Sequence, residues 1–283
     1  MGWQELFATR AKRARVFVLL AVACVLSGPR VSHAASAADT VAANWTGFYV
    51  GANAGGTWAK SKTDSPLDSS GCASGLVWCY AGSVTADINN VSAQTLKPSG
   101  FTGGVQAGYN FQYRSVVFGG EADFNAFRLH QTSTVTSFFT CCPPPGTANT
   151  YTNSVSTDWL FTARGRLGFA ANNWLVYGTG GLAVTRLSYA HAYIEGTAGG
   201  AGGIETSSAS ATRAGYVVGG GVEHRWLRNW SLKAEYLYLD IGSIRTAATA
   251  LGSSTQGTSG HVFNHSANLT ANVVRLGLNY KID

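Results

Sequence analysis

The alternation of side chains over Ala214–Asp240 constrains the fold of this chain more than any other sequence feature. The segment contains two runs with a period of two, which predict two β-strands joined by a tight turn at Leu227–Asn229. One predicted face is apolar and aromatic, and the other carries glycines and charges. The apolar face holds Tyr216, Val218, Val222, Trp226, Trp230, Leu232, Tyr236 and Tyr238, and the charged face holds Glu223, Arg225, Lys233 and Glu235. An apolar exterior with aromatic rims and a charged interior is typical of a transmembrane β-barrel.

Six further segments bring the number of predicted strands to eight. Most of them alternate as the hairpin does, whereas Trp174–Thr185 is apolar on both faces and its register stays open. The six segments are Gly47–Ala59, Gly100–Gln112, Ser115–Phe127, Val155–Ala170, Trp174–Thr185 and Asn272–Ile282. Strands of roughly ten residues are long enough for a tilted crossing of a bilayer.

The connections between these strands alternate strictly between short and long. Three are tight turns, and four are long polar segments that we interpret as loops: residues 60–99, 128–154, 186–213 and 243–271. With both termini on one side, every short turn falls on that side and every long loop on the other. An irregular β-sandwich has no reason to sort its loops by length. The sequence therefore predicts an all-β fold, an eight-stranded antiparallel up-and-down transmembrane barrel with short periplasmic turns and long extracellular loops.

The N-terminus has the features of a secretory signal peptide. Basic residues from Arg10 to Arg15 precede the apolar stretch Val16–Leu26, and small residues follow, so we expect cleavage after Ala34 or Ala37. The predicted organisation is a signal peptide over 1–34, a periplasmic lead-in over 35–46 and the barrel over 47–283. Removing 34 residues leaves 15 basic and 13 acidic residues, a formal charge of +2 in place of +6. No basic tract remains, which argues against nucleic acid as a partner.

Several motifs resemble those of one known family. The segments WTGFYVGANAGG, GFTGGVQAGYNFQ, VFGGEADF, TARGRLGFA, YGTGGLAV and VRLGLNYK are similar to alphaproteobacterial outer-membrane β-barrel "porin family" proteins. That family includes major surface antigens and haemin-binding proteins of rhizobia and related pathogens. The resemblance implies an eight-stranded barrel in the cell outer membrane, but no single activity. Such barrels commonly end in an aromatic residue that the barrel insertion machinery recognises, whereas this chain ends Tyr280-Lys281-Ile282-Asp283.

Charged residues on the predicted inner face are the strongest candidate site. Counted from the turns and the C-terminus, they fall at a common depth. They are Glu121, Asp123, Arg164, Arg166, Glu223, Arg225, Lys233, Glu235 and Arg275. An eight-stranded barrel has room inside for side chains and little else, and buried charges must pair. We expect a lumen largely filled by paired charges; the alternative is a narrow, gated ion path.

Four cysteines remain after cleavage, and all lie on predicted extracellular loops: Cys72, Cys79, Cys141 and Cys142. An oxidising compartment favours disulfides. We expect a Cys72–Cys79 bond, while a cross-loop pairing stays open for the adjacent Cys141 and Cys142. No metal site and no cofactor are expected, because the cysteine spacing does not match a zinc site and no histidine pair stands beside it.

Histidines and catalytic groups give weaker signals. His261 and His265 are four residues apart in a predicted loop, and the resemblance makes them speculative haemin contacts. Histidines in such Ser/Gly-rich loops are usually solvated. His224 lies on a strand, but Glu223 points to the opposite face, so no catalytic residue is assigned and the chain is not expected to be an enzyme.

These observations favour a structural and surface-interaction protein of the outer membrane. The alternative is a small-solute porin or a receptor for haemin or another ligand at the cell surface. The expected partners are outer-membrane lipid, the barrel insertion machinery and an extracellular ligand that binds the loops. We expect the protein to be a monomer.

Overall fold

In the computed structural model the described residues are 43–74, 78–139, 147–196 and 202–282. Residues 42–283 form one compact unit. The predicted signal peptide and lead-in lie almost wholly outside the described residues, as do Cys141 and Cys142. Within the described ranges, no helix has the length and apolar character needed to cross a membrane.

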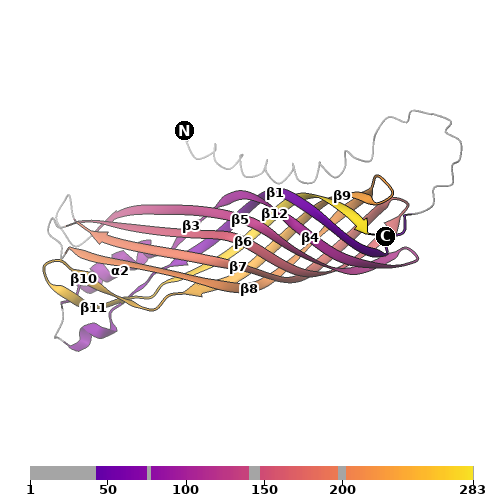
Figure 1. The fold of residues 1–283 in the computed structure, drawn as a ribbon. Coiled ribbons are helices and arrows are strands. Elements are labelled where there is room, and N and C mark those ends of the chain that lie inside the picture. The colour runs from indigo at the N-terminus through magenta and orange to yellow at the C-terminus, as the bar shows by residue number, and fades with distance from the viewer. Residues whose placement is uncertain (1–42, 75–77, 140–146, 197–201, 283) are drawn as a thin grey trace, which may run out of the picture. The chain divides into compact units, whose positions relative to one another are not determined.

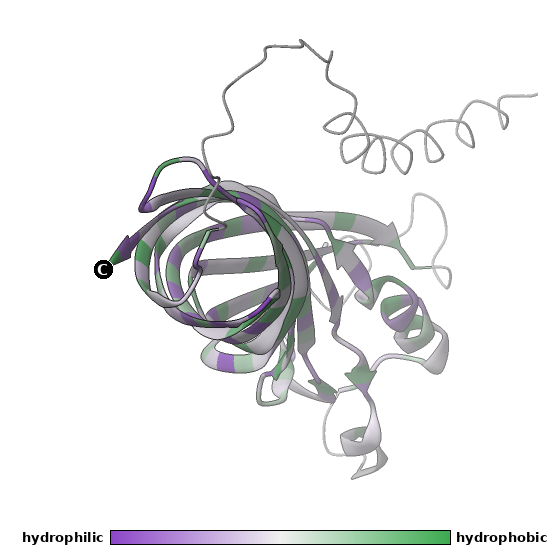
Figure 2. Ribbon diagram, turned by 90° about the vertical axis from the view of Figure 1, so that its right-hand side faces the viewer, coloured by the Kyte–Doolittle hydropathy of each residue, from purple (hydrophilic) through white to green (hydrophobic). Residues whose placement is uncertain are grey.

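Eight long antiparallel strands close into a ring (Figure 1). Each pairs with its neighbour along the chain, and the last pairs with the first. They are β1 (Gly47–Asp64), β4 (Ser99–Tyr113), β5 (Val116–Phe138), β6 (Ala148–Ala171), β7 (Trp174–Glu195), β8 (Gly203–Arg225), β9 (Trp230–Arg245) and β12 (Ser266–Ile282). The closed ring is visible along its axis in Figure 2. The predicted antiparallel barrel is confirmed.

Four short strands join the same sheet, which therefore contains twelve strands. They are β2 (Leu67–Asp68), β3 (Gln94–Leu96), β10 (Thr249–Ser253) and β11 (Gly257–Phe263). A 3₁₀ helix, η1 (Ser70–Ser74), and a helix, α2 (Gly82–Ser92), lie in the same region of the chain as β2 and β3. In Figure 1, α2, β10 and β11 gather at the end of the barrel opposite the short turns. The first and last predicted loops thus contain regular structure.

An apolar belt surrounds the ring on its outer face. Aromatic pairs mark its two margins: Trp230 and Tyr280 pack with ring centroids 5.0 Å apart near the short turns, and Phe124 and Trp159 lie 5.8 Å apart toward the other end. Exposed residues of the belt include Phe48, Val50, Val105, Phe118, Leu167, Val176, Leu182, Val218, Leu232, Val274, Leu276 and Leu278. Such a belt, flanked by aromatic girdles, is the surface that a bilayer covers. The structure also defines the register of β7, which the sequence left open. Leu175 and Tyr177 point inward, and Trp174 and Val176 point outward.

Four strands continue well beyond the belt, and the prediction of long loops is wrong there. We call residues 128–138, 148–158, 186–195 and 203–213 of β5 to β8 the extension. Its alternation has serine and threonine on the outer face where the belt has apolar residues, because this face meets water rather than lipid. The sequence signal was weak since serine, glycine and alanine are typical of loops as well as of a solvated strand face.

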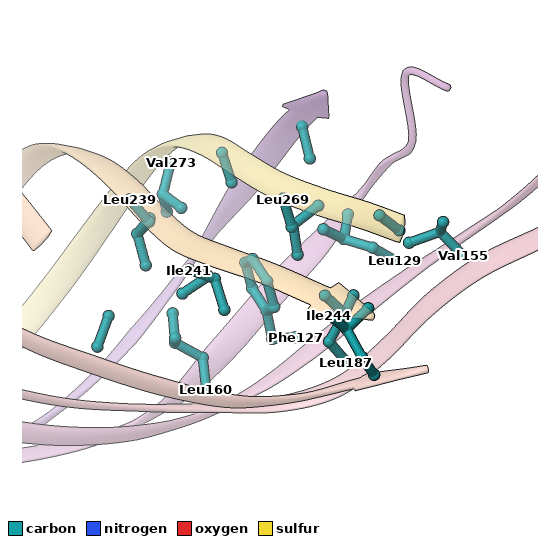
Figure 3. Close-up of a cluster of buried hydrophobic side chains, with 14 of the residues drawn as sticks. Phe127, Leu129, Val155, Leu160, Leu187, Leu239, Ile241, Ile244, Leu269 and Val273 are labelled. Carbon is teal, nitrogen blue, oxygen red and sulfur yellow. The ribbon is translucent and has the colours of Figure 1, made fainter. Parts of the chain in front are cut away.

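The described part of the interior contains three apolar clusters, of which the smallest, around Trp45 and Leu175, lies at the end with the short turns. The largest fills the lumen beside the outer margin of the belt, and Figure 3 shows its side chains converging between the strands. It includes Phe127, Leu129, Val155, Leu160, Leu187, Leu239, Ile241, Ile244, Leu269 and Val273. The second, which we call the cap, joins α2, β2, β10 and β11 to the extension; its members are Leu67, Val84, Ile88, Phe139, Tyr151, Tyr193, Leu251 and Phe263. An eight-stranded ring is too narrow to hold a water channel beside such side chains.

Candidate functional site in the barrel lumen

Eight buried charged side chains meet inside the ring and form what we call the charge layer. Four are cations and four are anions, so their formal charges cancel. They are Arg164, Arg166, Lys233, Arg275, Glu121, Asp123, Glu223 and Glu235, all at most 5% exposed. The ninth predicted member, Arg225, contacts Trp45 and Asn44 at the end of the barrel with the short turns.

Strand register brings these residues together. Glu121 on β5 is directly opposite Arg164 on β6. On the other side of the ring, β9 places Glu235 opposite Arg275 of β12. Opposite charges at facing positions are a stabilising cross-strand pair. The layer is therefore built into the strand pairing itself.

Each carboxylate of the layer accepts several hydrogen bonds, at least one of them from a charged donor. Asp123 accepts from Arg164 and from Arg275, both at 2.9 Å, and from Thr162 at 2.7 Å. Glu235 accepts from Arg164 at 3.0 Å and from Arg275 at 2.8 Å. Buried ions keep their charge only when paired and hydrogen-bonded in this way. The arrangement leaves no free side-chain carboxylate in this layer to attract a passing cation.

Two tyrosines that the sequence analysis did not single out complete the layer. The Tyr49 hydroxyl donates to Glu121 at 2.8 Å and accepts from Arg166 at 3.0 Å. Tyr177 donates to Glu235 at 2.9 Å, and its ring lies 4.1 Å from the Arg166 guanidinium. Both tyrosines occupy inward positions that alternate with outward residues on their strands, and this periodicity was the available signal.

The periplasmic mouth is closed by a different group. Trp45 is buried, and the Arg225 guanidinium stacks on its ring at 4.8 Å while donating to the Asn44 carbonyl at 2.7 Å. The predicted place of Arg225 in the charge layer is wrong because β8 ends there and its side chain reaches the segment before β1. The cavity at this mouth measures about 20 Å³, room for roughly one water molecule.

The lumen is charged over only part of its length. Beyond the charge layer, inward positions of β9 and β12 become apolar, with Leu237, Leu239 and Val273 all at most 1% exposed. The prediction of a lumen filled by paired charges is therefore incomplete. Apolar packing fills much of the rest, since a narrow ring can exclude water without charge.

Cys72 and Cys79 form a disulfide beside the cap. His261 packs against it, with Nε2 3.6 Å from Cys72 Sγ, and the same nitrogen accepts the Tyr80 N–H at 2.8 Å. Burial lowers the pKa of His261. The sulfurs are bonded to each other, so they are not available as thiolate ligands.

The second predicted haemin contact, His265, lies in another cluster, with His191 and Glu205. His265 Nε2 is 3.2 Å from Glu205 Oε1, and His191 Nε2 is 3.5 Å from Glu205 Oε2. Burial and the neighbouring His265 lower the pKa of His191 to about 4. The expectation of solvated loop histidines is wrong, because His191, His261 and His265 are only 1–3% exposed beneath the cap. Neither predicted haemin contact is open to an external ligand in this structure.

His224 and its neighbour Glu223 do not form the acid–histidine pair that a catalytic site would need. The His224 ring packs on Trp174 with centroids 4.3 Å apart, near the short turns, while Glu223 points into the charge layer. The two side chains leave the strand on opposite faces, as alternation requires.

Comparison with known proteins agrees with this architecture. The family model described as "Outer membrane protein beta-barrel domain" matches residues 20–281. The chain belongs to this family. It is 34% identical over 281 residues to the 31 kDa outer-membrane immunogenic protein of Brucella melitensis, covering 98% of this chain and 95% of the relative. It is also 33% identical over 144 residues to a 22 kDa outer membrane protein of Rhizobium leguminosarum bv. viciae, covering 51% and 54%.

Solved structures align over most of the chain at low identity. The outer membrane protease OmpT of Escherichia coli aligns with a TM-score of 0.46 and 10% identity, over 86% of this chain and 100% of that one. OprG of Pseudomonas aeruginosa aligns with a TM-score of 0.42 and 10% identity, over 85% and 99%. The family assignment and the apolar belt place the barrel in outer-membrane lipid.

Proposed function

We propose that this protein is a closed barrel that reinforces the outer membrane and meets extracellular partners through its extension. The observation that carries the proposal is the filled interior. Trp45 and Arg225 close the mouth, the charge layer follows, and the apolar cluster and the cap close the far end. An interior of this kind suits a structural barrel rather than a conduit.

The outer face of the extension supports the surface-interaction role. Facing hydroxyls on β5 and β6 form hydrogen-bonded pairs, of which Thr134 with Thr152 is one, at 3.1 Å. Further pairs are Thr132 with Ser154 and Thr136 with Thr150, at 3.2 and 3.4 Å. An uncharged array of donors and acceptors suits a polar partner. The name of the Brucella relative, an immunogenic protein, is consistent with exposure of such a face.

The other expected partners follow from the same features. A ring closed by long strands has no long free edge, which supports a monomer. Tyr280, close to the C-terminus on β12 and packed against Trp230, is the aromatic residue that we assign to recognition by the insertion machinery. No observation favours catalysis, a solute pore or haemin binding over this role.

Charged substitutions on the extension test the proposal. The double variant Thr134→Lys/Thr152→Lys changes a facing pair on the outer surface, and Val218→Ile on the lipid-facing belt serves as control. We expect binding of antiserum raised against intact wild-type cells to fall several-fold for the first variant only. Resistance to detergent and uptake of small solutes should stay unchanged. Unaltered antiserum binding together with altered solute uptake would overturn the proposal.

A further inference from the structure

The cluster of His191, Glu205 and His265 is not explained by the role proposed above. His191 lies on β7, Glu205 on β8, and His265 in the segment between β11 and β12. The three side chains are at most 3% exposed. His191 and Glu205 belong to the extension, and all three side chains lie between the apolar cluster of the lumen and the cap, and therefore outside the apolar belt.

Two atoms of this cluster lack the hydrogen bonds that buried polar atoms normally make. His191 Nε2 and Glu205 Oε2 are both buried, and neither has a hydrogen-bond partner. They face each other across 3.5 Å. Leaving a buried polar atom unsatisfied is unfavourable, so two such atoms that face each other indicate that a third species fits between them.

The hydrogen bond at the other side of the imidazole fixes which nitrogen carries the proton. His191 Nδ1 lies 3.0 Å from Asn153 Oδ1, an oxygen that also accepts the Tyr189 hydroxyl at 2.6 Å. Because that oxygen only accepts, the proton of neutral His191 is on Nδ1. The lone pair of Nε2 then points at a carboxylate oxygen, an arrangement that a cation between them stabilises.

The spacing of the ligand atoms fits a metal ion. One ligand atom from each of His191, Glu205 and His265 lies within 4.8 Å of the other two. His191 Nε2 lies 3.5 Å from Glu205 Oε2, and His265 Nε2 lies 3.2 Å from Glu205 Oε1, so each carboxylate oxygen faces one imidazole. Zinc bound at about 2.0–2.1 Å in tetrahedral geometry places its ligands about 3.4 Å apart.

The groups that hold the two imidazoles in place match those around known metal sites. A metal-bound histidine commonly donates its other nitrogen to a backbone or side-chain oxygen, which orients the ring. Asn153 Oδ1 accepts from His191 Nδ1 at 3.0 Å in this way, and Ser65 Oγ lies 3.0 Å from His265 Nδ1. Two imidazoles and a carboxylate are a donor set that divalent first-row metals such as zinc accept.

We propose that His191, Glu205 and His265 bind a divalent transition metal ion, with zinc as the probe. The ion would join β7, β8 and the segment before β12, and would thereby fasten the cap to the extension. His191 and His265 are 74 positions apart in the sequence. Glu205 lies between them in the sequence and is on a separate strand.

Metal content and spectroscopy test the site. Full-length protein refolded with zinc and then desalted should retain about one zinc per chain by elemental analysis, and cobalt in its place should give the visible absorption of a tetrahedral ion. His191→Asn and Glu205→Gln should each weaken zinc binding by at least about 100-fold, and Asn153→Ala by about 10- to 100-fold. His130→Asn, a histidine on the exposed outer face of β5, should bind zinc as the wild type does.

The wild-type result alone can refute the site if the variants fail to fold. Retention of less than about 0.2 zinc per chain by folded wild-type protein, or a cobalt spectrum of a six-coordinate aqueous ion, would overturn the proposal. So would equal zinc binding by the wild type and a folded His191→Asn variant. None of these outcomes bears on whether the lumen is closed, so the site and the proposed function fail independently.

Discussion

Removing one partner of the Glu235 and Arg275 pair should destabilise the barrel strongly. Glu235 accepts from Arg275 Nε at 2.8 Å, and the Arg275 terminal nitrogen lies 2.7 Å from the same carboxylate. Arg275→Met keeps much of the side-chain volume but leaves a buried layer with one excess negative charge. Glu235→Gln leaves one excess positive charge. Breaking a buried pair on one side costs about 3–5 kcal/mol, and we expect this for each single variant.

The double variant should cost less than the two single variants together. Arg275→Met/Glu235→Gln restores a neutral layer, because both charges leave at once. Coupled neighbours differ from additivity by about 0.5–3 kcal/mol, and we expect the upper part of this range. The free energy of unfolding is measured by urea titration in lipid vesicles, with the fluorescence of the seven tryptophans that follow the predicted signal peptide as signal.

Arg186→Met is the matched control for this cycle. Arg186 lies on the exposed face of the extension, where its Nε donates to Ser210 Oγ at 2.7 Å. An exposed substitution of this kind should change the free energy of unfolding by no more than about 0.5 kcal/mol. Single variants within about 1 kcal/mol of the wild type, or additivity within about 0.5 kcal/mol, would refute the account of the charge layer.

Three further predictions concern packing, the disulfide and pH. Gly221→Val should lower the urea midpoint because a Cβ at Gly221 would meet a backbone oxygen at 2.6 Å, whereas Gly120→Val, whose Cβ has space, should not. Replacing Cys72 and Cys79 by alanine removes a cross-link worth about 2–3 kcal/mol to a short loop; amide exchange of α2 should accelerate by up to about 150-fold while the barrel stays protected. Burial lowers the pKa of His261 in the folded state, so its contribution to stability is present above about pH 6.5 and is lost as the pH falls. Loosening of the cap below that pH should be weaker in His261→Gln, and an identical acid response would contradict this.

The ring of strands was predictable because the two faces of each barrel strand meet different surroundings, lipid outside and packed side chains inside. The side chains along each strand alternate to match them. Glu121, Arg164, Lys233 and Arg275 were assigned to the interior from their parity on the strands alone. Arg225 was misplaced because parity says nothing about the height at which a strand ends.

The extension and the histidine cluster were harder to predict for different reasons. In the extension the outer face is hydrophilic, so the contrast between faces is small, although Leu187, Tyr189, His191 and Tyr193 do alternate with small residues. The cluster depends on contacts between segments far apart in sequence, and these follow from strand register and from the path of the chain through the cap. No local pattern encodes such a meeting point.

Conductance of the purified full-length protein in a planar lipid bilayer tests the closed lumen most directly. Trp45, the charge layer and the apolar cluster obstruct the interior in succession, so the wild type should give no stable channel of the size that general porins form. Repeated, long-lived openings of that size from folded wild-type protein would contradict the account.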